Sequence, residues 1–272
     1  MTGIVIPWDP VALQLGPLVL AWHGIFSSLG ILLGIWFAAW LAPRARSSPE
    51  DMWRAACPVI IGGLIGARLL YVAEHVPAFI RAPWRIVLVN EGGISVFGAV
   101  LGGMAGAALW ARRARVSPTR LLDVMAPAFL LGQAAGRLGD IVNGEHLGAH
   151  APGLPWAVIY THPNTLGEIG VPVHPAVAYE LLWDLAAALL ATWLLRNGLR
   201  PAGASLCLSL FLYGLGRLWV GYFRLDQPVL AGIGLAQLIG LLAMLFSVFG
   251  IWLTPRTRVA RVPNPVTGRD GG

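Results

Sequence analysis

Seven apolar segments, each near the length of about 20 residues that a helix needs to cross a bilayer, dominate the sequence. Hydrophobic residues make up 57% of the 272-residue chain and charged residues only 12%, which is not the balance of an ordinary soluble domain. We therefore predict an all-α integral membrane protein with seven transmembrane helices. The segments lie at 19–42, 56–77, 94–111, 119–138, 175–195, 204–222 and 231–253.

The arginines predict how these segments are oriented. All 19 basic residues are arginine, and most of them lie in alternate loops. One side carries Arg44, Arg46, Arg54, Arg112, Arg113, Arg115, Arg120, Arg196, Arg200, Arg256, Arg258, Arg261 and Arg269. The other side carries only Arg81, Arg85 and Arg224. By the positive-inside rule the first side is cytoplasmic, so the N-terminus faces outward and the C-terminus inward. Membrane topology therefore explains the excess of arginine and the net charge of +6, and no nucleic-acid partner is expected.

The organisation of the chain follows from the segments that are not apolar. The stretch 139–174 is rich in glycine, proline and polar residues, and irregular backbone does not occur in contact with lipid tails. We expect it to form a small extracytoplasmic cap on a single domain that covers 1–253. Residues 254–272 read as a basic cytoplasmic tail. Cys57 and Cys207 fall inside apolar segments with no metal or disulfide spacing, so no chemistry is assigned to them.

Three arginines lie inside predicted spans rather than in loops: Arg68, Arg137 and Arg217. An arginine at the centre of a membrane helix costs about 2.5–3.5 kcal/mol on insertion scales, so ionisable residues there usually mark a functional site. The alternative is a structural role, in which each arginine reaches the interface or pairs with a carboxylate. The candidate carboxylates are Asp123, Glu180 and Asp184.

The segment 136–148 concentrates polar groups at the outer end of the fourth predicted span. It contains four glycines together with Arg137, Asp140, Asn143 and Glu145. Glycine permits sharp turns and close backbone approach, and a guanidinium binds phosphate oxygens in a bidentate manner. The sequence therefore predicts a site for an anionic lipid headgroup.

This segment resembles the signature loop of the prolipoprotein diacylglyceryl transferases, in which Gly-Arg-x-Gly-Asn-x-x-Asn-Gly-Glu-x-x-Gly is expected. The likeness extends over nearly the whole chain, through Gly62 to Arg68 with Tyr71, His174-Pro175 with Tyr179-Glu180, and Tyr213-Gly214 with Arg217 and Phe223-Arg224. The resemblance implies an enzyme of the bacterial inner membrane. Its substrates would be phosphatidylglycerol and prolipoprotein signal peptides with a lipobox cysteine. The diacylglyceryl group would pass to the cysteine thiol, and glycerol phosphate would leave.

The resemblance also implies roles for individual residues. Arg137 and Arg217 would hold the phosphate, while Asn143 and Glu145 would orient the headgroup. Further substrate-binding candidates are Arg68, Tyr71, Gly139, Gly144, Gly148, Tyr179, Glu180, Tyr213 and Arg224. Tyr179 and Tyr213 fit an ordinary interfacial role equally well. No cofactor and no metal are expected.

The chain departs from the family pattern at four positions. Phe97 stands where a histidine is expected, Asp140 replaces an asparagine, Gly221 replaces a glutamate, and His23 replaces a tyrosine. A second carboxylate in the loop should repel phosphate unless it is paired or protonated.

Two interpretations follow from these departures. In one, the transfer activity is retained and His23, Asp140, Glu145 or His146 accepts the thiol proton. In the other, the chain is a divergent paralogue with another acceptor, or a membrane protein that binds anionic headgroups without catalysis. We favour retained activity, because the loss of one base costs less than the loss of electrostatic stabilisation.

Other classes fit the sequence less well. A transporter would be expected to show an inverted repeat with broken helices, and we find none in the sequence. An intramembrane protease needs a nucleophile with a base, and Ser95, Ser205 and Ser209 have no convincing partner. His146 and His150 have metal-like spacing but no third ligand fixed by the sequence.

Overall fold

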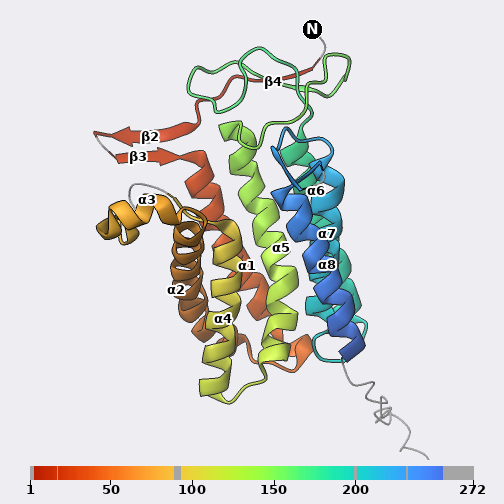
Figure 1. Ribbon diagram of the computed structural model, residues 1–272. Coiled ribbons are helices and arrows are strands. Elements are labelled where there is room, and N and C mark those ends of the chain that lie inside the picture. Colours follow the sequence, from red (N-terminus) through yellow and green to blue (C-terminus); the bar gives the residue numbers. More distant parts are fainter. Residues whose placement is uncertain (1–2, 17, 89–92, 199–200, 231, 254–272) are drawn as a thin grey trace, which may run out of the picture.

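The computed structural model describes residues 3–16, 18–88, 93–198, 201–230 and 232–253, and this part of the chain is mostly helical (Figure 1). Its long helices are α1 (Trp22–Leu41), α2 (Pro49–Glu74), α4 (Val96–Ala114), α5 (Pro118–Asn143), α6 (Ala176–Arg196), α7 (Ala204–Gly221) and α8 (Leu235–Leu253). They correspond one to one with the seven predicted segments. The predicted tail, 254–272, lies outside the described residues.

Five of these helices are long and apolar enough to cross a membrane: α1 with the short 3-10 helix η1 (Ala42–Ala45), then α2, α6, α7 and α8. The other two, α4 and α5, are less apolar over the length of a span. Arg112 and Arg113 close the last turn of α4, and α5 includes Asp123, Arg137 and Asp140. The chain is thus a multi-pass membrane protein, whose α5 is polar because it carries part of the site described below.

Glycines set the distances between paired helices. Gly62 and Gly66 of α2 lie against Gly98 and Gly102 of α4, so closely that a Cβ atom at Gly66 would come within 2.8 Å of the Gly102 Cα. Small residues allow such backbone approach between membrane helices. The four-residue spacing of these glycines places them on one face of each helix and allows this close packing.

Several short elements project from the helices near one end of the molecule. The antiparallel hairpin of β2 (Val11–Leu15) and β3 (Leu18–Ala21) and the helix α3 (Val76–Arg81), followed by η2 (Pro83–Ile86), extend to the same side (Figure 1). A second hairpin, β5 (Pro228–Leu230) with β6 (Ile233–Gly234), connects α7 to α8. The prediction of an all-α fold missed these strands because they are only two to five residues long.

A small irregular unit lies over the end of α5 and is formed by two distant parts of the chain (Figure 1). Strand β1 (Ile4–Ile6) pairs in parallel with β4 (Val158–Tyr160). Ile6, Val158, Tyr160 and Val173 pack together as its buried core. We call residues 3–6 and 144–175 the cap. Compared with the predicted segment 139–174, α5 continues to Asn143 and the N-terminal strand is an added component.

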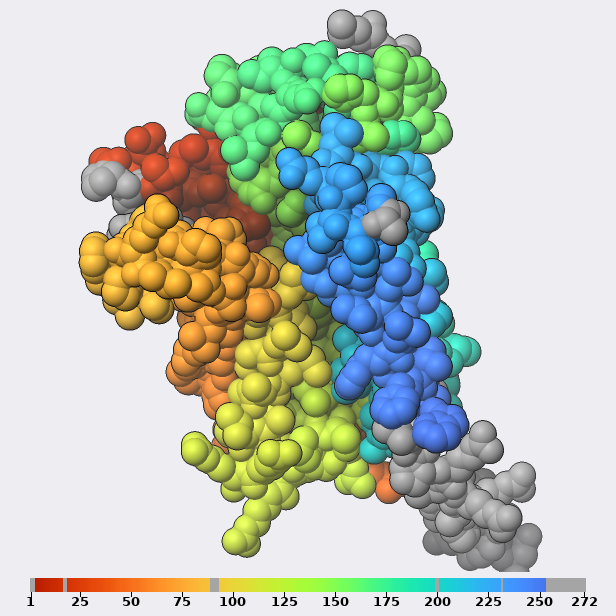
Figure 2. Space-filling model, in the orientation of Figure 1, coloured from red at the N-terminus to blue at the C-terminus, as the bar shows by residue number. Residues whose placement is uncertain are grey.

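The outer surface of the helices is apolar. Large side chains such as Trp36, Leu64, Leu182 and Leu245 are more than half exposed, as expected for helices in contact with lipid. In the space-filling view, the face is hollowed between α4, in yellow, and α8, in blue (Figure 2).

Candidate active site

Three arginine side chains converge on the carboxylate of Glu180. Arg137 Nη2 lies 2.8 Å from Oε2, whereas Arg217 Nη1 and Arg224 Nη1 lie 2.7 Å and 3.1 Å from Oε1. The four side chains are at most 10% exposed. In a site so poorly exposed to water, a guanidinium binds an anion more strongly than it does in bulk water.

Four chain segments supply this arginine cluster. Arg137 lies near the end of α5, Glu180 in the second turn of α6, and Arg217 in α7, while Arg224 follows α7. Backbone hydrogen bonds fix the last segment to the loop after α5, since Leu225 N donates to Leu147 O at 2.9 Å and Ala149 N donates to Phe223 O at 2.8 Å. The structure therefore brings Arg137 and Arg217 together at one site.

A glycine turn ends α5 and directs the signature loop back toward the helix. Gly144 has φ +74°, in the left-handed region that favours glycine, and its N–H donates to Asp140 O. Glu145 N donates to the same carbonyl at 3.2 Å. Gly148 lies against the backbone of His174, where no side chain could fit. These two glycines hold the loop close to both α5 and the start of α6.

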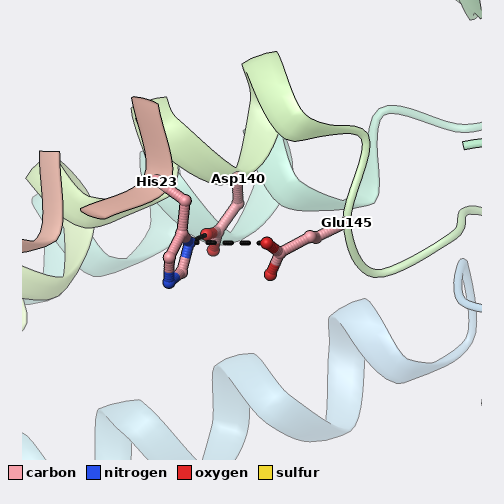
Figure 3. A group of neighbouring side chains, drawn as sticks. All are labelled: His23, Asp140 and Glu145. Atoms are coloured by element: carbon pink, nitrogen blue, oxygen red, sulfur yellow. Dashed lines mark hydrogen bonds and ion pairs between the residues drawn. The ribbon is translucent and has the colours of Figure 1, made fainter. Parts of the chain in front are cut away.

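Asp140 is paired on both of its carboxylate oxygens. Oδ2 accepts a hydrogen bond from Arg137 Nη1 at 2.6 Å, and Oδ1 lies 2.5 Å from His23 Nδ1 (Figure 3). Its side chain is only 4% exposed. The repulsion of phosphate that an unpaired carboxylate would cause is thus reduced by two positive or proton-donating partners.

Asn143 and Glu145 lie beside this pair. Asn143 Nδ2 donates to Glu145 Oε1 at 2.6 Å, and the same oxygen lies 3.6 Å from His23 Nδ1. Among the described residues of this site, the buried atoms without a hydrogen-bond partner are Arg137 Nε, Asn143 Oδ1 and Glu180 Oε2, the last of which has an ion-pair contact with Arg137. Because buried polar atoms are rarely left unpaired, one free donor and one free acceptor indicate that a ligand completes the site.

His146 adopts a backbone conformation that the sequence did not indicate. Its φ is +57°, which is uncommon for a residue with a side chain and often marks a functional segment. Burial, together with the charges of Arg137 and Arg224, lowers the pKa of His146, so its imidazole is neutral at neutral pH. His150 instead pairs with Glu168 at 2.8 Å on the surface of the cap, so the two histidines do not converge on one metal.

The two predicted tyrosines occupy different places. The guanidinium carbon of Arg217 lies 5.0 Å from the ring centre of Tyr213, a cation–π arrangement within the arginine cluster. The Tyr179 hydroxyl accepts a hydrogen bond from Trp156 Nε1 at 2.9 Å and lies 3.3 Å from His174 Nδ1. Tyr179 therefore links the cap to α6, beside the cluster.

Arg68 and Tyr71 are in another part of the molecule. Arg68 donates to the backbone carbonyls of Ile86, Leu88 and Gly93, and its guanidinium carbon is 5.8 Å from the Tyr71 ring centre. These contacts hold the segments that flank η2 and α4. The structure does not place Arg68 among the arginines that contact Glu180.

Two departures from the family pattern have a clear structural setting. A Cβ atom at Gly221 would meet the side chain of Gln237, whose Oε1 accepts a hydrogen bond from Gly234 N at 3.0 Å. Gln237 thus occupies the space into which a glutamate at 221 would extend. Phe97, in the first turn of α4, is half-buried and offers no titratable group.

Two polar neighbours of the site, Gln133 and Asp226, were not singled out from the sequence. Gln133 Nε2 donates to Asp184 Oδ2 at 2.7 Å, and both residues line a small cavity with Glu180 and Arg217. Asp226 holds Arg224 through two contacts of 2.9 Å. The helical spacing of Gln133, one turn before Arg137, is a signal that could have identified it.

Asp123 has a different role from the one considered in the sequence. Its carboxylate accepts hydrogen bonds from Gly203 N at 2.6 Å and Leu206 N at 2.9 Å. It therefore caps the start of α7. The possibility that Asp123 pairs with an intramembrane arginine is wrong, because its two oxygens face this helix end.

His23, Asp140 and Glu145 have the composition of a metal site, with ligand atoms that all lie within 4.8 Å of one another. The distances do not fit an ion in this arrangement. Zinc lies about 2.0–2.2 Å from each N or O ligand, so tetrahedral ligand atoms are more than about 3 Å apart. His23 Nδ1 and Asp140 Oδ1 are 2.5 Å apart, which is a hydrogen-bond distance.

Comparisons with known proteins identify the family of this chain. The sequence pattern of the family described as prolipoprotein diacylglyceryl transferase matches residues 10–253. Proteins named phosphatidylglycerol--prolipoprotein diacylglyceryl transferase from Synechococcus elongatus and Gloeobacter violaceus are 36% and 33% identical to the chain. The alignments cover 90% and 97% of this chain and 87% and 98% of those proteins. A protein of the same name from Solidesulfovibrio magneticus is 35% identical over 92% of this chain and 94% of its own length. The chain belongs to the prolipoprotein diacylglyceryl transferase family.

Proposed function

We propose that this protein transfers the diacylglyceryl group of phosphatidylglycerol to the lipobox cysteine of prolipoprotein signal peptides, in the bacterial inner membrane. Family membership and the names of the relatives support this reaction. The observation that carries it is the convergence of Arg137, Arg217 and Arg224 on Glu180 beside the signature loop.

The chemistry requires fixed positive charge at the leaving group. The thiolate sulfur forms a bond to the glycerol carbon, the bond between this carbon and the phosphate oxygen breaks, and glycerol phosphate leaves with one more negative charge. Arg137 and Arg217 are fixed in a poorly hydrated site, where they stabilise that charge without reorganisation. Glu180 keeps the two guanidinium groups in position before the lipid arrives.

The unpaired buried atoms suggest how the headgroup is oriented. Arg137 Nε is a free donor for a phosphate oxygen. Asn143 Oδ1 is a free acceptor, and a glycerol hydroxyl is a donor. A headgroup that combines phosphate with glycerol satisfies both atoms, whereas a choline headgroup offers no hydroxyl to Asn143. This pairing supports phosphatidylglycerol as the substrate.

The proposed membrane arrangement has seven spans, an outward N-terminus and an inward C-terminus. Arginines gathered at one end of the helices, such as Arg112 and Arg113 in the last turn of α4, support it. The cap, which includes the loop that follows α5, lies at the opposite end (Figure 1). The arginine cluster would then face the outer leaflet, where secreted signal peptides emerge.

Transfer can be measured with purified protein, phosphatidylglycerol and a lipobox peptide, by the mass gain of the peptide and by release of glycerol phosphate. We expect Arg137→Ala to lower kcat by about 10²–10³-fold, as the loss of one transition-state donor does. Arg54→Ala is the matched control, because Arg54 lies on the surface and pairs only with Glu50 among the described carboxylates.

The outcomes separate the candidate functions. Near-normal turnover of Arg137→Ala would remove this residue from the mechanism. If the unchanged protein binds phosphatidylglycerol but modifies no peptide under conditions in which a family member does, it is a lipid-binding paralogue. The phenylalanine at position 97 is the observation that favours this second candidate.

A further inference from the structure

The proposed reaction needs a group that accepts the thiol proton, and the family position for a histidine holds Phe97. A thiolate, not a thiol, is the nucleophile. Four other residues near the signature loop could act as the base: His23, Asp140, Glu145 and His146. The structure distinguishes among them by their partners and exposure.

Three of the four are already engaged. Asp140 is 4% exposed and uses one oxygen for Arg137 and the other for His23. Glu145 Oε1 accepts a hydrogen bond from Asn143 at 2.6 Å. His146 Nδ1 lies 3.3 Å from Arg224 Nη2. A guanidinium N–H can only donate, so His146 Nδ1 already accepts a hydrogen bond.

His23 differs because its two ring nitrogens have different surroundings. A carboxylate only accepts hydrogen bonds, so Nδ1 carries the proton that it shares with Asp140, and the lone pair of the neutral ring is on Nε2. Figure 3 shows this second nitrogen on the far side of the ring, directed away from both carboxylates. The His23 side chain is 43% exposed, so a substrate thiol has room to approach it.

The same hydrogen-bonded chain joins His23 to the phosphate-binding arginines. Asp140 contacts His23 through one oxygen and Arg137 through the other, and Arg137 contacts Glu180. Asp140 and Arg137 both lie on α5, so this helix connects the base, which α1 carries, to the leaving-group site. A displacement reaction needs the nucleophile on one side of the carbon and the phosphate on the other, and a lipid bound between His23 and the arginines would meet this requirement.

We propose that His23 is the general base of this protein, with Asp140 as the residue that orients its ring, in place of the histidine missing at Phe97. The inference rests on the proposed transfer function. The thiol proton moves to His23 Nε2, the sulfur forms its bond to the glycerol carbon, and the electron pair of the breaking C–O bond leaves with the phosphate. The imidazolium then returns its proton to solvent or to the departing phosphate.

The test compares transfer kinetics at two pH values. At neutral pH, His23→Gln should lower kcat by about 10²–10⁴-fold, the usual contribution of a general base, with little change in the KM for phosphatidylglycerol. The cysteine thiol of the peptide has a pKa of about 8.5, and about one pH unit above this value it ionises without a base. We therefore expect most of the difference in kcat between His23→Gln and the unsubstituted protein to disappear there. The charged groups that face His23 are Asp140, Glu145 and Arg137.

Two further variants control for folding and for histidine loss in general. His23→Tyr introduces the residue that the family pattern has at this position, so the fold should tolerate it, and it should show the same pH-dependent defect. His150→Gln removes a histidine on the surface of the cap and should have unchanged kinetics.

Several results would overturn the proposal. A defect in His23→Gln and His23→Tyr that is equally large at both pH values would indicate a structural role, and no defect would exclude His23 from proton transfer. Loss of wild-type activity on chelation with EDTA, restored by zinc, would indicate a metal held by His23, Asp140 and Glu145 instead. If the protein without any substitution transfers no diacylglyceryl group, the proposed function is wrong. That result differs from the ones above, which concern only the role of His23.

Discussion

Glu180 is the residue on which the arrangement of the charged site depends. It is the anion that three guanidinium groups share, and its side chain is 5% exposed. Without it, three buried cations would lie close together with fewer anions to offset them. Removal of one partner of a buried ion pair is strongly destabilising because an uncompensated charge remains.

We therefore expect Glu180→Gln to lower the free energy of unfolding by about 3 kcal/mol or more, measured by thermal unfolding in a neutral detergent. Glu50→Gln is the control, since Glu50 forms an exposed pair with Arg54 that contributes less than about 1 kcal/mol. Phosphatidylglycerol should raise the Tm of Glu180→Gln more than that of the unchanged protein, because its phosphate supplies the missing anion. Equal Tm values for Glu180→Gln and the unchanged protein would show that the arginines do not depend on this carboxylate.

At the residue scale, the sequence identified the charged members of the site and Glu180 as a possible partner of the arginines, but not the other pairings. Arg137 and Arg217 stood out because arginines are costly within apolar helices, and Glu145 stood out because it lies in the glycine-rich segment 136–148. The pairing of His23 with Asp140 joins residues 117 positions apart, which no local spacing indicates. Arg68 has the same intramembrane signal as Arg137, yet its donors meet backbone carbonyls, and only the structure separates the two cases.

At the scale of elements, the contact between α1 and α5 positions His23. Gly139 of α5 lies against the start of α1, where a Cβ atom would be 2.6 Å from the His23 Cα. Asp140 follows Gly139 on α5, so a larger residue at position 139 would move His23 away from Asp140. Gly30 and Gly132 continue the close approach of the same two helices.

Gly139→Ala should lower both the transfer rate and the Tm, because overpacking of this kind typically costs about 1–3 kcal/mol. Gly24→Ala is the matched control in α1, since no heavy atom lies within 4 Å of the added Cβ position. Gly24→Ala should unfold at the same temperature as the unchanged protein, or at a higher one. Normal transfer by Gly139→Ala would mean that the α1–α5 distance is not critical for catalysis.

The elements themselves were predictable to different degrees. Seven long helices follow from the length of the apolar segments, because a bilayer permits few alternatives to a helix. The short strands, such as β1 and β4, were not predictable, because their pairing is between distant segments of three residues each. The glycines of α2 and α4 gave a usable signal, since their spacing places them on one helix face.

At the scale of the whole molecule, the proposed orientation can be tested by labelling single cysteines. In a variant with Cys57 and Cys207 replaced by alanine, Gly153→Cys in the cap should react with an impermeant maleimide in intact cells. Arg113→Cys, at the opposite end of α4, should react only after the membrane is opened. The reverse pattern of labelling would invert the proposed topology and place the arginine cluster toward the cytoplasm.

The loop after α5 is held largely by main-chain groups. Amides and carbonyls of Leu147 and Ala149 bond to those of Phe223, His174 and Leu225 on either side. Peptide groups are the same whatever amino acid carries them, so this frame keeps its shape while the residues that point into the site are exchanged. An evolving lineage could thus move its proton acceptor from one helix to another and still leave the lipid in the same place.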